Sequence, residues 1–128
     1  MSLELKILAL SVILGLVQIL LSAHAASLQV GYRWTATARE VRPPLTGVAG
    51  RLERALRNFL ETFPLFAAAI LLVQVTGRNG RMSAIGAEFY LAARVIYVPL
   101  YVAAVPLLRS LVWNVATVGI ILVLLSLL

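Results

Sequence analysis

Ionisable and amide side chains recur along one stretch of the chain that leads directly into a strongly apolar run. The stretch reads RLERALRNFLETFP over residues 51–64, and FAAAILLVQV follows over residues 66–75. Arg54, Asn58 and Glu61 are spaced four and three residues apart, so a helix would carry them on one face. Charged groups at membrane depth are costly and persist mostly where they line a site or a buried interface. The spacing therefore predicts a polar pocket that suits an anionic ligand.

The alternative interpretation of the same stretch is a helix end that emerges into water and carries ion pairs on its surface. Glu53 and Arg57 fit that interpretation, because residues four apart on a helix can form such pairs. Asn58 and Glu61 fit it less well, since they lie deeper, next to the apolar run. Arg51 extends the polar face by one turn, and we assign it to the expected pocket.

A second polar stripe comprises Tyr90, Arg94, Tyr97 and Tyr101, at intervals of four, three and four residues. At about 100° per residue, these side chains fall within a narrow sector of a helix. An unpaired guanidinium near mid-span would be very unfavourable, so Arg94 is expected to pair with Glu61 or with a bound anion. Tyrosines also form belts at membrane interfaces, but a belt would cluster at the helix ends. This stripe runs along the helix through an arginine, which favours a pocket.

The residue types that are missing exclude several kinds of chemistry. The chain has no Cys and no Asp, and its one histidine is His24. Thiolate metal sites, a cysteine nucleophile and a Ser-His-Asp triad are therefore excluded, and no metal site is expected. Any chemistry must therefore use Arg, Tyr, Glu, Asn, Ser or Thr side chains, or be brought in by a bound cofactor.

Composition places the chain in a membrane. Of its 128 residues, 62% are hydrophobic and 12% are charged, which is far more apolar than an ordinary soluble domain. The formal net charge is +6, but most basic residues flank apolar segments and do not form a nucleic-acid stripe. Those in the longest connection and after it are Arg33, Arg39, Arg42, Arg51, Arg54 and Arg57. We therefore expect no nucleic-acid partner.

Four apolar segments are each close to the ~20 residues that a spanning helix needs. They cover about residues 5–26, 55–75, 84–108 and 111–128. Turn-like residues 76–81 join the second and third segments, and residues 106–110 are expected to join the third and fourth. The prediction is an all-α integral membrane protein, with residues 1–128 forming a single four-helix domain.

The first segment has a rival interpretation as a signal peptide, because SAHAA at residues 22–26 resembles a cleavage site. Glu4 and the length of the apolar run argue against it, so we expect an uncleaved first span. An even number of spans puts both termini on one side. The long connection between the first two spans is more basic than the opposite side, which predicts that this connection is cytoplasmic.

The pattern resembles the MAPEG family, the membrane-associated proteins in eicosanoid and glutathione metabolism. The resemblance covers nearly the whole chain and rests on PPLTG at 43–47, ERALRNFLETFP at 53–64 and RVIYVPLY at 94–101. The chain length resembles the short bacterial members. The family resemblance implies a homotrimeric four-helix bundle, with glutathione bound between subunits near the cytoplasmic side. It also implies a bacterial inner-membrane location.

The resemblance carries residue roles with it. Arg54, Asn58 and Glu61 match the motif that grips glutathione. Arg94, Tyr97 and Tyr101 match residues that complete that pocket. In enzymatic members an arginine near the cytoplasmic end of the third or fourth helix stabilises the glutathione thiolate. Here Arg109 is the candidate; its alternative role is a topology-setting charge.

Two functional classes remain open from the sequence. The first is a glutathione transferase or peroxidase that acts on lipophilic substrates arriving through membrane lipid. The second is a non-catalytic lipid-binding or scaffolding protein, in which the polar stripes hold subunits together. Glu88 and His24 have no assigned role.

Overall fold

The computed structural model describes residues 1–31 and 44–128. Within these residues the chain forms four helices, α1 (Leu3–Val30), α3 (Gly47–Thr76), α4 (Arg81–Val102) and α5 (Pro106–Leu125). Each of them is long and apolar enough to cross a membrane, as the sequence predicts. The basic residues Arg33, Arg39 and Arg42, on which the predicted orientation partly rests, lie outside the described residues.

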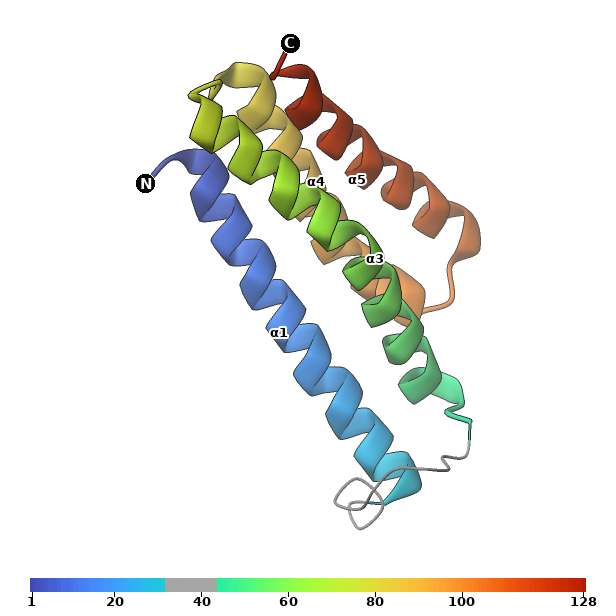
Figure 1. Cartoon of the computed structure of the whole chain (residues 1–128). Coiled ribbons are helices and arrows are strands. Elements are labelled where there is room, and N and C mark those ends of the chain that lie inside the picture. Colours follow the sequence, from blue (N-terminus) through green and yellow to red (C-terminus); the bar gives the residue numbers. More distant parts are fainter. Residues whose placement is uncertain (32–43) are drawn as a thin grey trace.

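The helices run up and down in an elongated bundle (Figure 1). Figure 1 shows both chain ends and the α3–α4 turn at one end of the bundle, and the α4–α5 turn toward the other. Helix α4 packs most extensively on α5 and also contacts α1 and α3. The common end of the two termini agrees with the even number of spans expected from the sequence.

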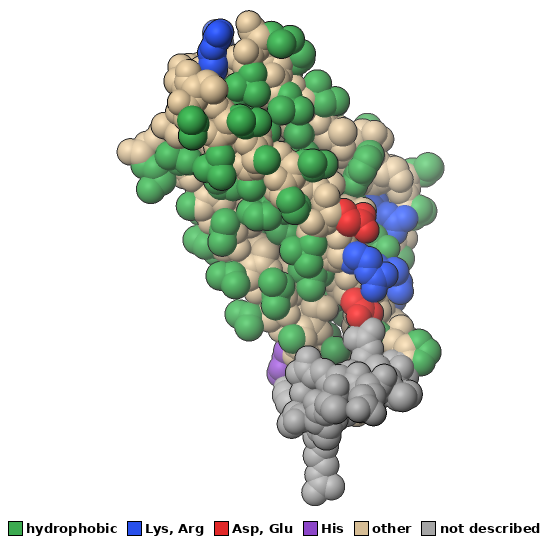
Figure 2. All heavy atoms as spheres, viewed as in Figure 1, with side chains coloured by type: hydrophobic (Ala, Val, Ile, Leu, Met, Phe, Trp, Pro, Cys, Tyr) green, Lys and Arg blue, Asp and Glu red, His purple; other side chains and the backbone are tan. Residues whose placement is uncertain are grey.

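The core is apolar and lies mainly where α3, α4 and α5 meet, with α1 adding one buried edge. Its buried members are Ile7, Phe59, Phe66, Ala69, Ile70, Val73, Ala87, Tyr90, Ala93, Ala116, Ile120 and Val123. Large apolar side chains are also exposed along every helix, and they dominate the face in Figure 2. Such a surface is suited to lipid, because exposing apolar side chains to hydrocarbon does not cost free energy as exposure to water does.

Helices α4 and α5 meet through two glycines. A Cβ atom added to Gly86 would lie 2.6 Å from the carbonyl oxygen of Gly119, and one added to Gly119 would lie 2.5 Å from that of Gly86. Real Cβ atoms do not approach this closely. The two backbones therefore touch, as small residues allow at helix crossings in membranes.

Polar contacts tie both ends of α1 to the rest of the bundle. The buried Glu4 accepts hydrogen bonds from the side chains of Asn79 and Ser83, each 2.7 Å long. At the other end, the Gln29 amide makes two hydrogen bonds to the backbone of Thr46, of 2.8 and 3.0 Å. These contacts set α1 beside the start of α3 and the start of α4.

The connection between the last two helices differs from the sequence-based expectation. The sequence predicts a third span reaching residue 108 and a link over residues 106–110, whereas α4 ends at Val102 and α5 already begins at Pro106. Proline suits the first position of a helix, because its ring presets φ and its missing N–H has no partner there. Ala104 adopts a left-handed φ of 58° within the short turn. Arg109 consequently belongs to α5.

Candidate functional site

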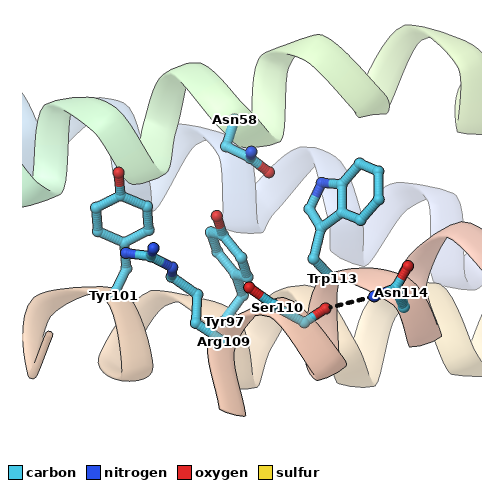
Figure 3. A pocket seen from close by; sticks show the side chains of 7 residues that line it. All are labelled: Asn58, Tyr97, Tyr101, Arg109, Ser110, Trp113 and Asn114. Carbon is cyan, nitrogen blue, oxygen red and sulfur yellow. Dashed lines mark hydrogen bonds between the residues drawn. The ribbon is translucent and has the colours of Figure 1, made fainter. Parts of the chain in front are cut away.

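A cavity of about 460 Å³ lies between α3, α4 and α5 (Figure 3). Its volume falls in the range typical of small-molecule sites, roughly 300–1,000 Å³. The residues that line it are Asn58 from α3, Tyr97 and Tyr101 from α4, and Arg109, Ser110, Trp113 and Asn114 from α5. Donor groups thus converge from three helices on one space, and none of the lining residues is acidic.

Arg94 lies behind the cavity wall and is only 1% exposed. Its Nη1 donates a 2.9 Å hydrogen bond to Oδ1 of Asn58. The guanidinium carbon also lies 4.3 Å from the ring centre of Tyr97 and 5.6 Å from that of Phe59. The expectation that Arg94 avoids lipid is confirmed. The prediction that Glu61 is its protein partner is wrong. Asn58, one turn earlier on α3, accepts the hydrogen bond instead.

Two other guanidinium groups lie over Tyr101. The Arg109 guanidinium carbon is 4.4 Å from the ring centre of Tyr101, and that of Arg54 is 6.0 Å away. The ring of Tyr97 lies 5.6 Å from that of Tyr101. Cations within about 6 Å of an aromatic ring face are attracted by its quadrupole. Tyr101 therefore lies close to two positive groups, of which Arg109 lines the cavity and Arg54 does not.

Glu61 and Arg51 do not line this cavity. Glu61 is exposed and borders a second, shallower hollow on the outside of α3, together with Glu53, Leu56, Arg57 and Leu60. Arg51 is half-buried near the start of α3, and its Nε is buried without a hydrogen-bond partner among the described residues. Within one chain, Glu61 thus borders a different space from the one that Asn58 lines.

The first tyrosine of the α4 stripe belongs to the core. Tyr90 is fully buried, its ring stacks on Phe66 with centres 3.9 Å apart, and its hydroxyl lies 3.0 Å from that of Thr62. Only the later part of the stripe reaches the cavity. Tyr90 packs against Phe66 and Thr62 of α3, whereas Tyr97 and Tyr101, later on α4, line the cavity.

The α5 wall was not recognised from the sequence. Ser110, Trp113 and Asn114 follow Arg109 at spacings that place them along one side of α5. The Asn114 amide donates a 2.9 Å hydrogen bond to the backbone oxygen of Ser110 (Figure 3). Their spacing within an otherwise apolar segment is the signal that could have identified them.

The polar groups that line the cavity are of types that can bind an anion. Arg109 supplies a cation, Tyr97, Tyr101 and Ser110 supply hydroxyl groups, and Asn58 supplies an amide. No cluster of His and Glu residues that could hold a metal ion occurs in the described part of the chain. The guanidinium groups of Arg109 and Arg54, which lie near the Tyr101 ring, can attract carboxylates or a thiolate.

Comparison with known proteins gives one assignment. The model of the MAPEG family matches residues 7–128, nearly the whole chain. No curated protein and no solved structure gives a significant match. The matched range includes most of α1, all of α3, α4 and α5, and every residue that lines the cavity.

Proposed function

The chain belongs to the MAPEG family and is a multi-pass integral membrane protein, and from this premise we propose that it binds glutathione. The observation that carries the proposal is the cavity that Asn58, Tyr97, Tyr101 and Arg109 line without any acidic residue. Glutathione has two carboxylates, one ammonium and one thiol. A donor-rich cavity with a cation at its end fits the anionic groups of this tripeptide.

The placement of Glu61 supports a site that two subunits share. The ammonium of glutathione needs an acceptor, and the cavity wall of one chain offers no carboxylate. Glu61 and Arg54 are exposed on α3 outside that wall. We propose a homotrimer in which glutathione lies between neighbouring subunits, so that the ligand reaches both the cavity and the exposed polar face of α3.

The residues of the proposed shared site, in the cavity and on the exposed face of α3, have distinct roles. Arg54 and Asn58 would bind carboxylate, Glu61 would bind ammonium, and Tyr97 and Tyr101 would form the wall against the tripeptide. Arg109, held on the ring of Tyr101, would stabilise a thiolate by its charge. When bound, glutathione would supply the thiol that attacks an electrophilic carbon or reduces a hydroperoxide. Lipophilic substrates would arrive through membrane lipid.

The competing proposal is a non-catalytic protein that binds lipid or holds partners together. The exposed apolar side chains along the helices are compatible with it. The donor-rich cavity favours the glutathione site, because lipid tails offer nothing for its hydroxyl, amide and guanidinium groups to bind. We further propose that the protein resides in a bacterial inner membrane with the connection between α1 and α3 on the cytoplasmic side.

Calorimetric titration of the detergent-solubilised protein with glutathione tests the proposal. Arg54→Ala and Glu61→Gln should each weaken binding about tenfold or more, since each removes a charge-assisted contact. Arg78→Ala is the matched control, because Arg78 is exposed at the α3–α4 turn, toward the other end of the bundle. Equal losses in all three variants, or no binding by the wild type, would contradict the glutathione site.

Turnover of a chloronitrobenzene-type electrophile then separates the two classes. Glutathione-dependent conjugation by the wild type supports a transferase. Tight glutathione binding without turnover of electrophiles or hydroperoxides would support a non-catalytic role.

A further inference from the structure

We infer that Arg94 is a positioning residue, which turns the amide of Asn58 so that its N–H groups face the cavity and select a carboxylate. The inference rests on the proposed function for the identity of the ligand. It assigns to Arg94 a role that differs from direct ligand contact, because Arg94 is 1% exposed and is not among the residues that line the cavity.

The donor chemistry of arginine determines the orientation of Asn58. A guanidinium has only donors, so the amide atom that lies 2.9 Å from Arg94 must be the oxygen. The amide nitrogen of Asn58 then remains for the cavity, which Asn58 lines. No described residue accepts a hydrogen bond from that nitrogen. From the sequence alone, Asn58 could serve either a carboxylate or an ammonium; the contact with Arg94 leaves it as a donor.

The charge of Arg94 favours the same ligand. Its Nε and Nη2 are buried without a hydrogen-bond partner among the described residues. The rings of Tyr97 and Phe59 lie over the guanidinium but carry no net charge. A buried cation without an acidic partner is costly, and a carboxylate bound at Asn58 would supply the missing negative charge nearby. Arg94 should therefore strengthen anion binding while contributing little to the stability of the ligand-free protein.

A mutant cycle tests the contact without any ligand. Arg94→Met, Asn58→Leu and the double variant are compared with the wild type by thermal unfolding in detergent. If the hydrogen bond orients Asn58, the Asn58→Leu effect should change when Arg94 is absent, because contacting residues do not act additively. Additive shifts in the melting temperature would overturn the inference whether or not glutathione binds.

Ligand binding tests the consequence for recognition. Arg94→Met should weaken glutathione binding about tenfold or more, the range expected for a hydrogen bond to a charged group. Its melting temperature should stay equal or rise, because replacing an uncompensated buried charge with an apolar side chain of similar size is often stabilising. Arg94→Lys keeps the charge and a donor, so it should recover part of the affinity.

Asn58→Asp provides a second test that does not depend on removing the buried cation. The new carboxylate can still accept from Arg94, so the fold should hold, but the donor toward the cavity is lost. Binding of glutathione should fall at least as much as in Arg94→Met. The diester of glutathione, which lacks both carboxylates, should lose much less affinity than glutathione in both variants. Wild-type affinity in Asn58→Asp, or equal losses for glutathione and its diester, would overturn the carboxylate assignment.

These outcomes separate the two proposals. Absence of glutathione binding to the wild type contradicts the proposed function, while the mutant cycle still decides whether Arg94 and Asn58 are energetically coupled. Normal glutathione binding in the wild type and in both variants contradicts the positioning role alone.

Discussion

Three arginines, Arg54, Arg94 and Arg109, lie around the site and differ in exposure and in the groups that they contact. Arg94 is buried and bonded to Asn58, whereas Arg54 is exposed. Arg109 is half-buried on the ring of Tyr101, and its side chain lines the cavity. A guanidinium held on an aromatic ring keeps its charge and loses freedom of movement. In the proposed glutathione site, Arg109 is therefore the cation that we propose acts on the thiol.

Removal of Arg109 should separate rate from affinity. Without the cation, a bound thiol loses stabilisation of its charged form, so Arg109→Ala should raise its apparent pKa by roughly one unit or more. The thiolate would then form at higher pH than in the wild type, and turnover near neutral pH would fall, while glutathione affinity would change little. Thiolate absorbance against pH measures the first effect and steady-state kinetics the second.

A second variant and a contradicting outcome complete the test of Arg109. Arg109→Lys keeps a charge but loses the planar group that stacks on Tyr101, so it should fall between the wild type and Arg109→Ala. If thiolate absorbance and turnover are unchanged in Arg109→Ala, Arg109 is only a charge that helps to orient the helix in the membrane.

At the scale of elements, α4 and α5 act as one hairpin that carries most of the cavity wall. Their close packing depends on Gly86 and Gly119, and their turn depends on Ala104 in the left-handed region. The early start of α5 at Pro106 brings Arg109 back over Tyr101. The geometry of the site is therefore sensitive to residues that do not touch it.

Gly119→Ala should destabilise the hairpin. The new methyl group would meet the backbone oxygen of Gly86 at 2.5 Å and the backbone nitrogen of Tyr90 at 2.8 Å, neither of which can turn aside as a side chain could. Overpacking of this kind costs about 1–3 kcal/mol. Gly80→Ala is the control, because a Cβ there meets nothing within 4 Å. Thermal unfolding in detergent measures both variants, and equal melting temperatures would contradict the close packing of α4 on α5.

Ala104→Gly should have the opposite effect. Ala104 has a φ of 58°, a region that costs a residue with a Cβ about 1 kcal/mol and that glycine adopts without steric strain. The variant should therefore melt at a temperature equal to or slightly above that of the wild type. Ala104→Val should melt lower, because a β-branched side chain fits this region poorly. A marked loss of stability in Ala104→Gly would show that the turn needs the alanine methyl group.

At the scale of the whole molecule, the described chain leaves polar groups on the outside of α3. Arg54, Arg57 and Glu61 are exposed there, and charges of both signs gather at one edge of the face in Figure 2. Such groups are costly against lipid. Assembly of several subunits around α3 would cover them, which agrees with the proposed homotrimer.

Native mass spectrometry in a mild detergent should therefore detect a trimer. The proposed trimer would be refuted if the wild type is only a monomer in detergent and chemical crosslinking in membranes also yields only monomer.

Much of this fold could be predicted from the sequence, because membrane lipid cannot form hydrogen bonds with the backbone of a spanning segment. Lipid requires that each spanning segment satisfy its own backbone, so apolar length alone predicts four helices. The helix period likewise predicts that Asn58 and Arg94 lie on polar faces. The same reasoning indicated that Arg94 could not face hydrocarbon, and the structure buries it.

Other features depend on how the helices pack against one another. The periodicity of one helix cannot say which helix its polar face meets, so the bond between Arg94 and Asn58, the burial of Tyr90 and the separation of Glu61 from the cavity arise only in the packed bundle. The contribution of Ser110, Trp113 and Asn114 likewise depends on how α5 packs beside α3 and α4. The sequence by itself determined the class of protein and the residues that must avoid lipid. The tertiary structure decided their partners, because those partners lie on different helices, far apart in the chain, and meet only in the packed bundle.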